Sequence, residues 1–192
     1  MAASVDEILE VWFGNPVETY SQRRKLWFSK NPAFDQLLRD RFLSAYEQAA
    51  SGELGAWQTS PRSCLALVLL LDQFSRNMFR GQPRAFATDP QAQIIAKGAI
   101  AQGFDQQLEP VQRFFFYLPL EHSEHLADQN QAVALYQALV LDYSELQDGL
   151  EYAIRHQTVI QRFGRFPHRN VILNRPSTPE EIEFLKQPGS SF

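Results

Sequence analysis

Three short polar segments contain most of the residues that could do chemistry in this chain. Residues 71–77, 121–125 and 162–170 each place charged and hydrogen-bonding side chains next to aromatic or aliphatic ones. The first segment follows eight apolar residues, 64–71, a run that is typical of a buried element. Burying a charge costs free energy unless the charge is paired and hydrogen-bonded. We therefore expect the three segments either to satisfy one another or to bind a ligand.

The first segment carries charges at helical spacing. Asp72, Arg76 and Arg80 are spaced i, i+4 and i+8, so on a helix they share one side. In one interpretation Arg76 and Arg80 hold a carboxylate or phosphate while Asp72 orients one guanidinium. In the other, the charges form a buried salt-bridge network that joins this helix end to residues 165–170. The sequence leaves both interpretations open.

The second segment combines two histidines with two glutamates. His122 and Glu124 are candidates for a hydrogen-bonded acid–base pair or a ligand clamp. Glu121, His122 and His125 are weak metal candidates, because spacings of i+3 and i+4 can place two ligands on one helix face. However, the H-E-x-x-H signature of zinc enzymes is absent. We therefore predict no metal site here.

The third segment is rich in arginine and contains turn-forming Gly164 and Pro167. We predict an ordered loop in which Arg165 and Arg169 face a pocket, since long ordered loops often carry function. The alternative is a purely structural connection held by salt bridges to acidic residues elsewhere, namely Asp72, Asp89, Glu124 and Asp128.

Together these segments predict one pocket for a small anionic ligand. The expected ligand-binding residues are Asp72, Arg76, Arg80, Arg165, His168, Arg169 and Asn170. The expected catalytic residues are His122, Glu124 and His156. His156 lies in an apolar stripe and should point inward, where a neutral imidazole can accept a proton. We assign anion contact to Arg76, Arg165 and Arg169, and proton transfer to His122 with Glu124, or to His156.

Composition limits the classes of function. The 192 residues suit one domain, 1–192, and we expect 187–192 to form a frayed tail. A net charge of −4 gives no global attraction to nucleic acid or to an anionic membrane. Cys64 is the single cysteine, which favours a reducing compartment. The N-terminus has no stretch of signal-peptide character, so we predict a cytoplasmic location.

The hydrophobic pattern is helical nearly throughout, and no alternating strand pattern of useful length occurs. Capping boxes at Ser4, Ser144 and Thr178 mark three helix starts, and an interruption or kink is expected at Pro119. The expected helices cover about 4–14, 32–50, 61–78, 89–103, 109–119, 128–141, 144–163 and a short stretch from 178. The predicted fold is all-α, with stacked antiparallel helical hairpins.

A series of short motifs runs along nearly the whole chain. They occupy residues 11–14, 71–81, 85–89, 122–124, 128–129, 156, 162–170 and 177–178. Together they resemble the DUF924 family, bacterial and some eukaryotic proteins of unknown function. The resemblance implies an all-α fold like that of the tetratricopeptide-repeat superfamily, without strict repeats, and no established activity. Glu121 stands where the family pattern has an apolar residue, and His125 stands at a variable position.

Three functions remain open from the sequence. The first is binding of a small phosphate or carboxylate compound, with acid–base catalysis as an extension. The second is a helical-hairpin module that binds a protein partner, with the salt bridges as structural connections. The third is a metal-dependent hydrolase or oxidase. The sequence does not specify a cofactor, a reaction type or an oligomeric state.

Overall fold

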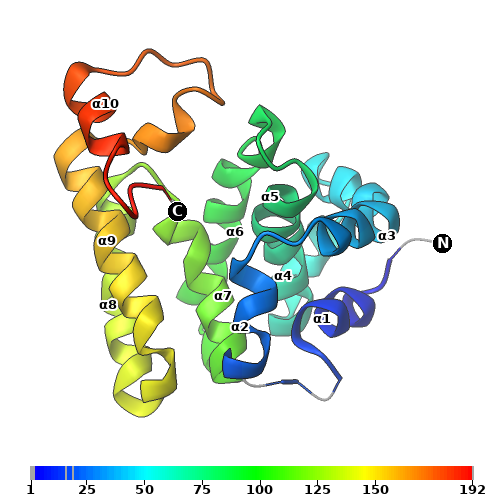
Figure 1. The fold of residues 1–192 in the computed structure, drawn as a ribbon. Coiled ribbons are helices and arrows are strands. Elements are labelled where there is room, and N and C mark those ends of the chain that lie inside the picture. The colour runs from blue at the N-terminus through cyan, green and yellow to red at the C-terminus, as the bar shows by residue number, and fades with distance from the viewer. Residues whose placement is uncertain (1–2, 16, 19, 192) are drawn as a thin grey trace.

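Every regular element of the described chain is helical (Figure 1). The structure is a computed structural model that describes residues 3–15, 17–18 and 20–191, and none of these residues lies in a strand. The all-α prediction is therefore confirmed. The α-helices are α1 Val5–Phe13, α2 Tyr20–Phe28, α3 Pro32–Ala50, α4 Pro61–Val68, α5 Ser75–Met78, α6 Asp89–Ala101, α7 Pro110–Glu121, α8 Leu126–Asp142, α9 Gln147–Phe163 and α10 Pro179–Leu185.

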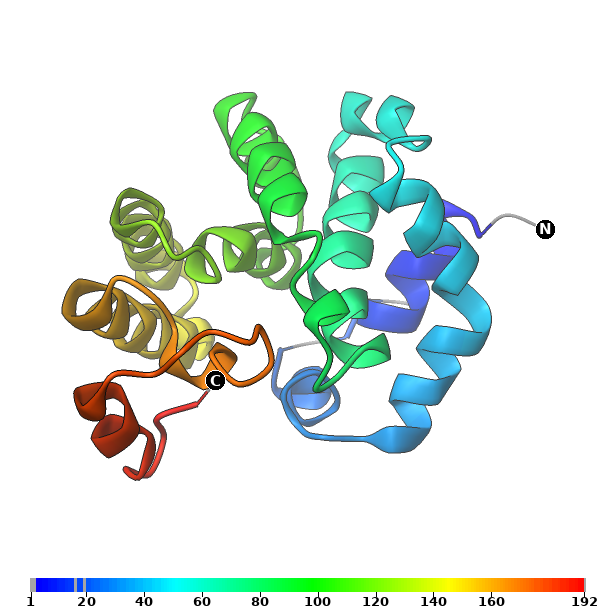
Figure 2. The ribbon, with the colours of Figure 1, turned by 90° about the horizontal axis from the view of Figure 1, so that it is seen from above.

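The helices pack largely in chain order. Helix α6 packs on α7, α7 on α8, and α8 on α9. Helix α3 packs on α5 and on residues 69–74, which directly precede α5. Seen from above, the N-terminal helices form one side of the molecule and α8 to α10 form the other (Figure 2). The finer likeness to tetratricopeptide repeats stays a prediction. No helix within the described ranges has both the length and the apolar composition that a membrane crossing requires.

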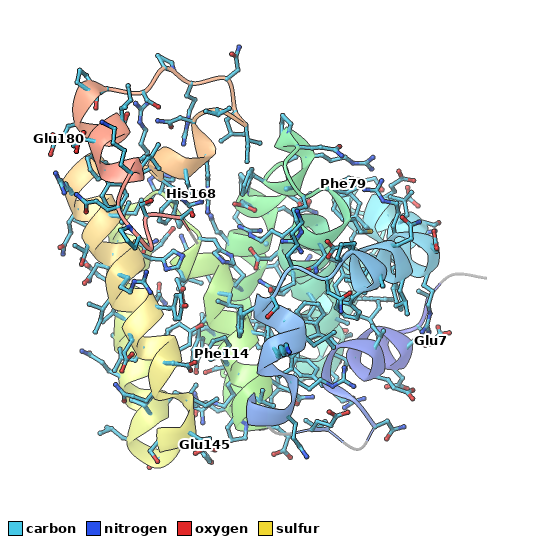
Figure 3. The ribbon with its side chains drawn as sticks, viewed as in Figure 1. Glu7, Phe79, Phe114, Glu145, His168 and Glu180 are labelled. Atoms are coloured by element: carbon cyan, nitrogen blue, oxygen red, sulfur yellow. The ribbon has the colours of Figure 1, made fainter. Side chains whose placement is uncertain are left out.

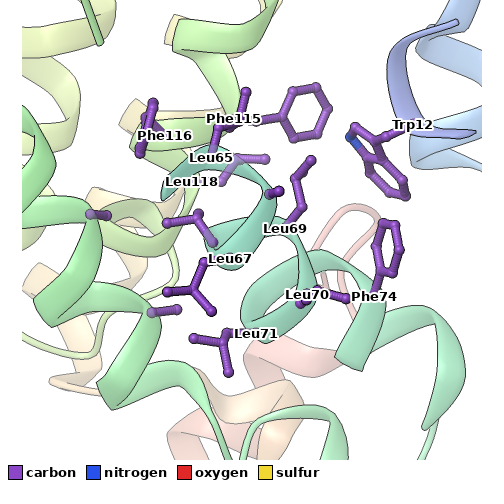
Figure 4. Packing of buried hydrophobic residues seen from close by; sticks show 14 of the residues in the cluster. Trp12, Leu65, Leu67, Leu69, Leu70, Leu71, Phe74, Phe115, Phe116 and Leu118 are labelled. Atoms are coloured by element: carbon purple, nitrogen blue, oxygen red, sulfur yellow. The ribbon is translucent and has the colours of Figure 1, made fainter. Parts of the chain in front are cut away.

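An aromatic cluster forms the centre of the core (Figure 4). The Trp12 ring centroid lies 5.4 Å from that of Phe74 and 5.5 Å from that of Phe115, the latter in an edge-to-face arrangement. All three side chains are fully buried. Such aromatic pairs add to the stabilisation from burial itself. The cluster therefore joins α1, residues 69–74 and α7 in one core.

The long buried helix expected over 61–78 is present, but its middle is a π-helix. The segment Leu69–Phe74, which we label η2, joins α4 to α5. The wider turn changes the regular hydrogen-bond pattern, and side chains bind the carbonyl groups there. Ser75 Oγ donates to the carbonyls of Leu71 and Asp72, and Thr88 Oγ1 donates to Leu71. π-Helical turns are frequent at functional sites, and this one contains Asp72.

Two local predictions were wrong. No side chain caps α9; Ser144 begins a 3₁₀ turn, and the helix itself starts at Gln147. Helix α7 is not interrupted at Pro119 but continues to Glu121, while the alternative of a kink at Pro119 stays a prediction. Proline removes one intrahelical hydrogen bond, and this loss is tolerated so close to the helix end. Helix α2 was not predicted at all, because its sequence has no apolar stripe.

Candidate functional site

A cavity of about 320 Å³ lies where the two halves of the chain meet. Its wall combines side chains from α2, from η2 and α5, from the end of α7, from α9 and from the loop after α9. Figure 3 places His168 on that loop, at the end of α9 opposite Glu145. The polar side chains of the wall are Ser29, Gln73, Arg76, Asn77, Arg80, His122, His156, His168 and Arg169.

His122 is oriented by a buried carboxylate. Its Nδ1 atom lies 2.8 Å from Oδ1 and 3.0 Å from Oδ2 of Asp72. Burial alone would raise the pKa of Asp72, but the charges of Arg76 and His122 outweigh burial and hold that pKa well below its usual range. Because an ionised carboxylate only accepts hydrogen bonds, Nδ1 of His122 carries the proton. In the neutral ring the opposite atom, Nε2, is then the basic one.

Arg76 and Arg169 share a second carboxylate, Asp89. Arg76 forms a two-pronged contact through Nη1 and Nη2 at 2.9 and 3.0 Å, and Arg169 Nη1 lies 3.3 Å from Oδ2. Arg169 Nη2 also donates to the carbonyl of His122 at 3.0 Å. Burial and the charge of Arg76 lower the pKa of Arg169 to about 10, so it stays protonated. The shared aspartate thus holds two cations at the cavity wall.

A second histidine, His156, also has a carboxyl close to its Nδ1 atom. Glu121 Oε1 lies 3.0 Å from this atom, and the carbonyl of Tyr152 accepts its proton at 2.8 Å. Glu121 is only 3% exposed, and burial together with the charge of Asp72 raises its pKa to about 8. Burial also lowers the pKa of His156 well below its usual value, and His122 adds to this effect. Both members of this pair are therefore neutral near pH 7.

The third histidine of the wall, His168, is neutral as well. Burial and the adjacent charge of Arg169 lower its pKa to about 3. Burial and the charge of Arg76 likewise lower the pKa of His122. At neutral pH the arginines are therefore the charged groups among the polar side chains of the wall.

Several predicted site residues bind elsewhere and shape the loop after α9. Glu124 accepts from Arg175 at 2.7 and 2.9 Å and from the backbone N–H of Phe166 at 2.8 Å. Arg165 forms a two-pronged pair with Glu181 at 2.6 and 2.8 Å. These contacts fasten the loop to the end of α7 and to α10.

The remaining predicted residues have distinct surroundings. Asn170 donates to Ser177 Oγ at 3.0 Å and is fully buried away from the cavity lining. Arg80 lines the cavity while pairing with Asp35 at 2.9 Å. His125 is exposed at the start of α8. No three His, Cys, Asp or Glu side chains of the described chain come together in a group that could hold a metal ion.

Sequence reasoning missed the apolar part of the wall. Trp27 and Phe28 end α2, and Phe86 and Ile172 come from two loops. Trp27 is buried in the core and also borders the cavity. No sequence signal identifies these residues, because their spacing is irregular and they belong to different elements.

The pattern that defines a family described as bacterial protein of unknown function (DUF924) matches residues 8–189. The chain belongs to this family. A solved structure titled protein of unknown function ATU0120, from Agrobacterium tumefaciens, has the same fold as this DUF924 protein, with a TM-score of 0.83. The two are 43% identical over 95% of this chain and 96% of the other. A search of curated proteins found no match.

Proposed function

We propose that this DUF924 protein binds a small anionic molecule in the cavity between its two halves. One observation carries the proposal. The wall contains three arginines and three histidines, whereas none of the described lining residues is acidic. The carboxylates of Asp72, Asp89 and Asp35 contact the arginines without contributing to the lining. A ligand in the cavity would therefore meet the cations first, which favours a phosphate or carboxylate group.

The same geometry supports acid–base chemistry by His122. A general base needs a basic atom within reach of the ligand and a pKa that leaves it unprotonated. The Asp72 contact fixes the Nδ1–H tautomer and leaves Nε2 as the basic atom of a ring that lines the cavity. We propose His122 as the general base and Asp72 as its positioning residue. His156 would be a second polar contact for the ligand.

One observation favours a different function. Both Nη atoms of Arg76 and both of Arg169 already donate to protein acceptors. Arginines that are paired in this way are expected in a purely structural salt-bridge network. In that case the protein would be a helical module that binds a protein partner. The two proposals differ in one measurable property, which is whether small anions bind to the wild-type cavity.

A thermal-shift experiment separates them. Phosphate, acetate and benzoate would be compared with sodium chloride at equal ionic strength and with methylammonium chloride as a cationic control. A ligand that binds the folded state raises Tm by mass action. We expect the anions to raise Tm above the chloride value and the cation to leave it unchanged. Equal Tm values for all solutes would contradict the proposal and favour the structural network.

Variants assign the effect to the cavity. Arg169→Gln removes a wall cation, and Arg80→Gln is a milder alternative because its side chain is 41% exposed. Arg162→Gln is the matched control, since Arg162 pairs with Glu180 at the surface. We expect the anion-induced shift to fall in the first two and persist in the control. For any ligand that wild type converts, His122→Asn should retain binding and lose conversion, because the amide N–H can still donate to Asp72.

A further inference from the structure

We infer that the ligand is a small aromatic acid, in which a carboxylate or phosphate group lies close to a single ring. This inference rests on the proposed function and specifies the other half of the ligand. The cavity wall is divided between the cationic and imidazole groups described above and an apolar part. The apolar part consists of Trp27, Phe28, Ala85, Phe86, Leu118 and Ile172.

The rings at the end of α2 present apolar surface to the cavity. Trp27 donates its only polar hydrogen, on Nε1, to the carbonyl of Trp12 at 2.9 Å. This hydrogen is therefore already used within the protein, and the contact that Trp27 can offer a ligand at the cavity wall is apolar. Phe28 borders the same cavity and is 47% exposed. A ring placed in the cavity would cover part of this exposed surface and gain the free energy of apolar burial.

These rings are held in place before any ligand arrives. The ring centroid of Phe115 lies 4.8 Å from that of Trp27 and 6.4 Å from that of Phe28. The Phe28 and Phe115 rings are nearly parallel, with 4° between their planes. Phe115 itself is fully buried in the core. A preorganised apolar surface loses little conformational entropy on binding, which favours a rigid ring as the ligand group.

Phe86 shows how close the apolar and cationic parts of the wall are. The guanidinium carbon of Arg169 lies 4.8 Å from the centre of the Phe86 ring, and the guanidinium carbon of Arg76 lies 5.7 Å from the same point. Such contacts are within the range of cation–π attraction. Because a phenyl ring and both arginines meet at one place, a ligand can contact all three only if its acid group is near its own ring. A long spacer between ring and acid does not fit this arrangement.

The volume sets an upper limit on the ligand. A cavity of about 320 Å³ is at the small end of the range for ligand sites, about 300–1,000 Å³. An apolar cavity of about 150 Å³ is enough to hold benzene in another protein. One ring with an acid group is therefore of suitable size, whereas a dinucleotide is too large.

Calorimetric titration of the full chain with matched pairs tests the inference. Benzoate is compared with acetate, and phenyl phosphate with inorganic phosphate, so that each pair differs by the ring. Benzamide and benzylamine keep the ring and change the charge. We expect the ring to lower Kd at least about tenfold in each pair, as complementary apolar contacts do. We also expect benzamide and benzylamine to bind more weakly than benzoate by a similar factor.

The variant Phe28→Ala should raise the Kd of benzoate toward that of acetate and leave the Kd of acetate unchanged. Leu141→Ala, on the outer surface of α8, is the control and should change neither Kd. If Phe28→Ala lowers Tm strongly, Phe28→Leu gives the same comparison with less loss of packing. If acetate and phosphate bind but the ring adds nothing, the inference is wrong and the proposed function stands. If no anion binds, both are wrong.

Discussion

The pairs Asp72–His122 and Glu121–His156 have the same contact but different chemistry. In each pair a buried carboxyl lies about 3 Å from Nδ1 of a histidine that lines the cavity. Asp72 has Arg76 beside it, with Nη1 at 3.0 Å, and its pKa is held low. For Glu121, burial comes first and the charge of Asp72 adds to it, so the pKa rises to about 8. Asp72 is therefore ionised beside Arg76 and His122, whereas burial and the charge of Asp72 keep Glu121 protonated.

This difference indicates distinct roles for the two histidines. A carboxylate beside Nδ1 stabilises the imidazolium that forms when Nε2 takes a proton, whereas a neutral carboxyl does so much less. His122 is therefore the better base, and His156 the better neutral hydrogen-bonding group. Pairs of titratable groups whose environments push their pKa values apart are typical of sites that separate acid and base roles. The following predictions test this comparison, from the largest expected effect to the smallest.

Removing the charge from each carboxyl should have unequal effects. At pH 5, we expect Asp72→Asn to lower the free energy of unfolding by about 3 kcal/mol, because it breaks a buried ion pair. Glu121→Gln should change it by less than about 1 kcal/mol, since glutamine resembles the protonated acid already present. Urea denaturation of the two variants and wild type measures both effects. Equal losses would show that the two carboxyls have the same charge.

The pH dependence of stability should differ between wild type and Glu121→Gln. The pKa of Glu121 is about 8 in the folded protein and 4.5 in a reference peptide. Its contribution to stability is therefore fully present below about pH 4.5 and lost as pH rises through about 8. We expect the free energy of unfolding of Glu121→Gln to rise relative to that of wild type by up to about 1.4 kcal/mol per pH unit over this window. Urea titrations from pH 5 to pH 9 measure the gain, and parallel curves would contradict it.

For His168 we expect stability to change with pH in the opposite direction. Its pKa is lowered from 6.5 to about 3, so the unfolded chain binds the proton first as pH falls. Its contribution to stability is present above about pH 6.5 and lost as pH falls toward 3. Between pH 6 and pH 4, wild type should lose free energy of unfolding as the pH falls. We expect this loss to be smaller in His168→Gln by up to about 1.4 kcal/mol per pH unit. Identical acid limbs in the two proteins would contradict the neutral state of this partly buried ring.

The smallest effect is expected at a surface ion pair. Arg162 and Glu180 are 2.8 Å apart, with side chains that are 47% and 63% exposed. Exposed pairs contribute little, so Arg162→Gln should lower the free energy of unfolding by less than about 1 kcal/mol. Equilibrium unfolding at low and at high salt measures it. A loss as large as that of Asp72→Asn would show that burial does not explain the difference between these pairs.

Part of the site could be predicted from local spacing. Asp72 and Arg76 are one helical turn apart, and they do form an ion pair. The structure also brings His122, His156 and Arg169 to the same cavity. Their roles toward a ligand remain proposals. The loop after α9 was less predictable, because its arginines had many acidic groups within reach. Arg165 binds Glu181, while Arg169 binds Asp89.

The apolar half of the cavity was not predictable. Trp27 and Phe28 lie on α2, which has no amphipathic stripe to reveal it. Their contact with Phe115, far along the chain, depends on how α2 packs against α7. The sequence of α2 allows several ways of packing this helix against α7. The contacts of the whole core select one of them.

The sequence by itself determined most of the helices other than α2, several of their capped ends and the types of polar group available, because these depend on hydrogen bonds and spacing within a few residues. Only the tertiary structure decided that Glu121 is buried within range of the charge of Asp72 and therefore stays protonated. The physical reason is that the charge of a buried carboxyl depends on its distance to a cation and its depth below the surface. The distance between Asp72 and Arg76 is set within one helical turn, whereas the depth of both carboxyls is fixed only when distant segments pack together.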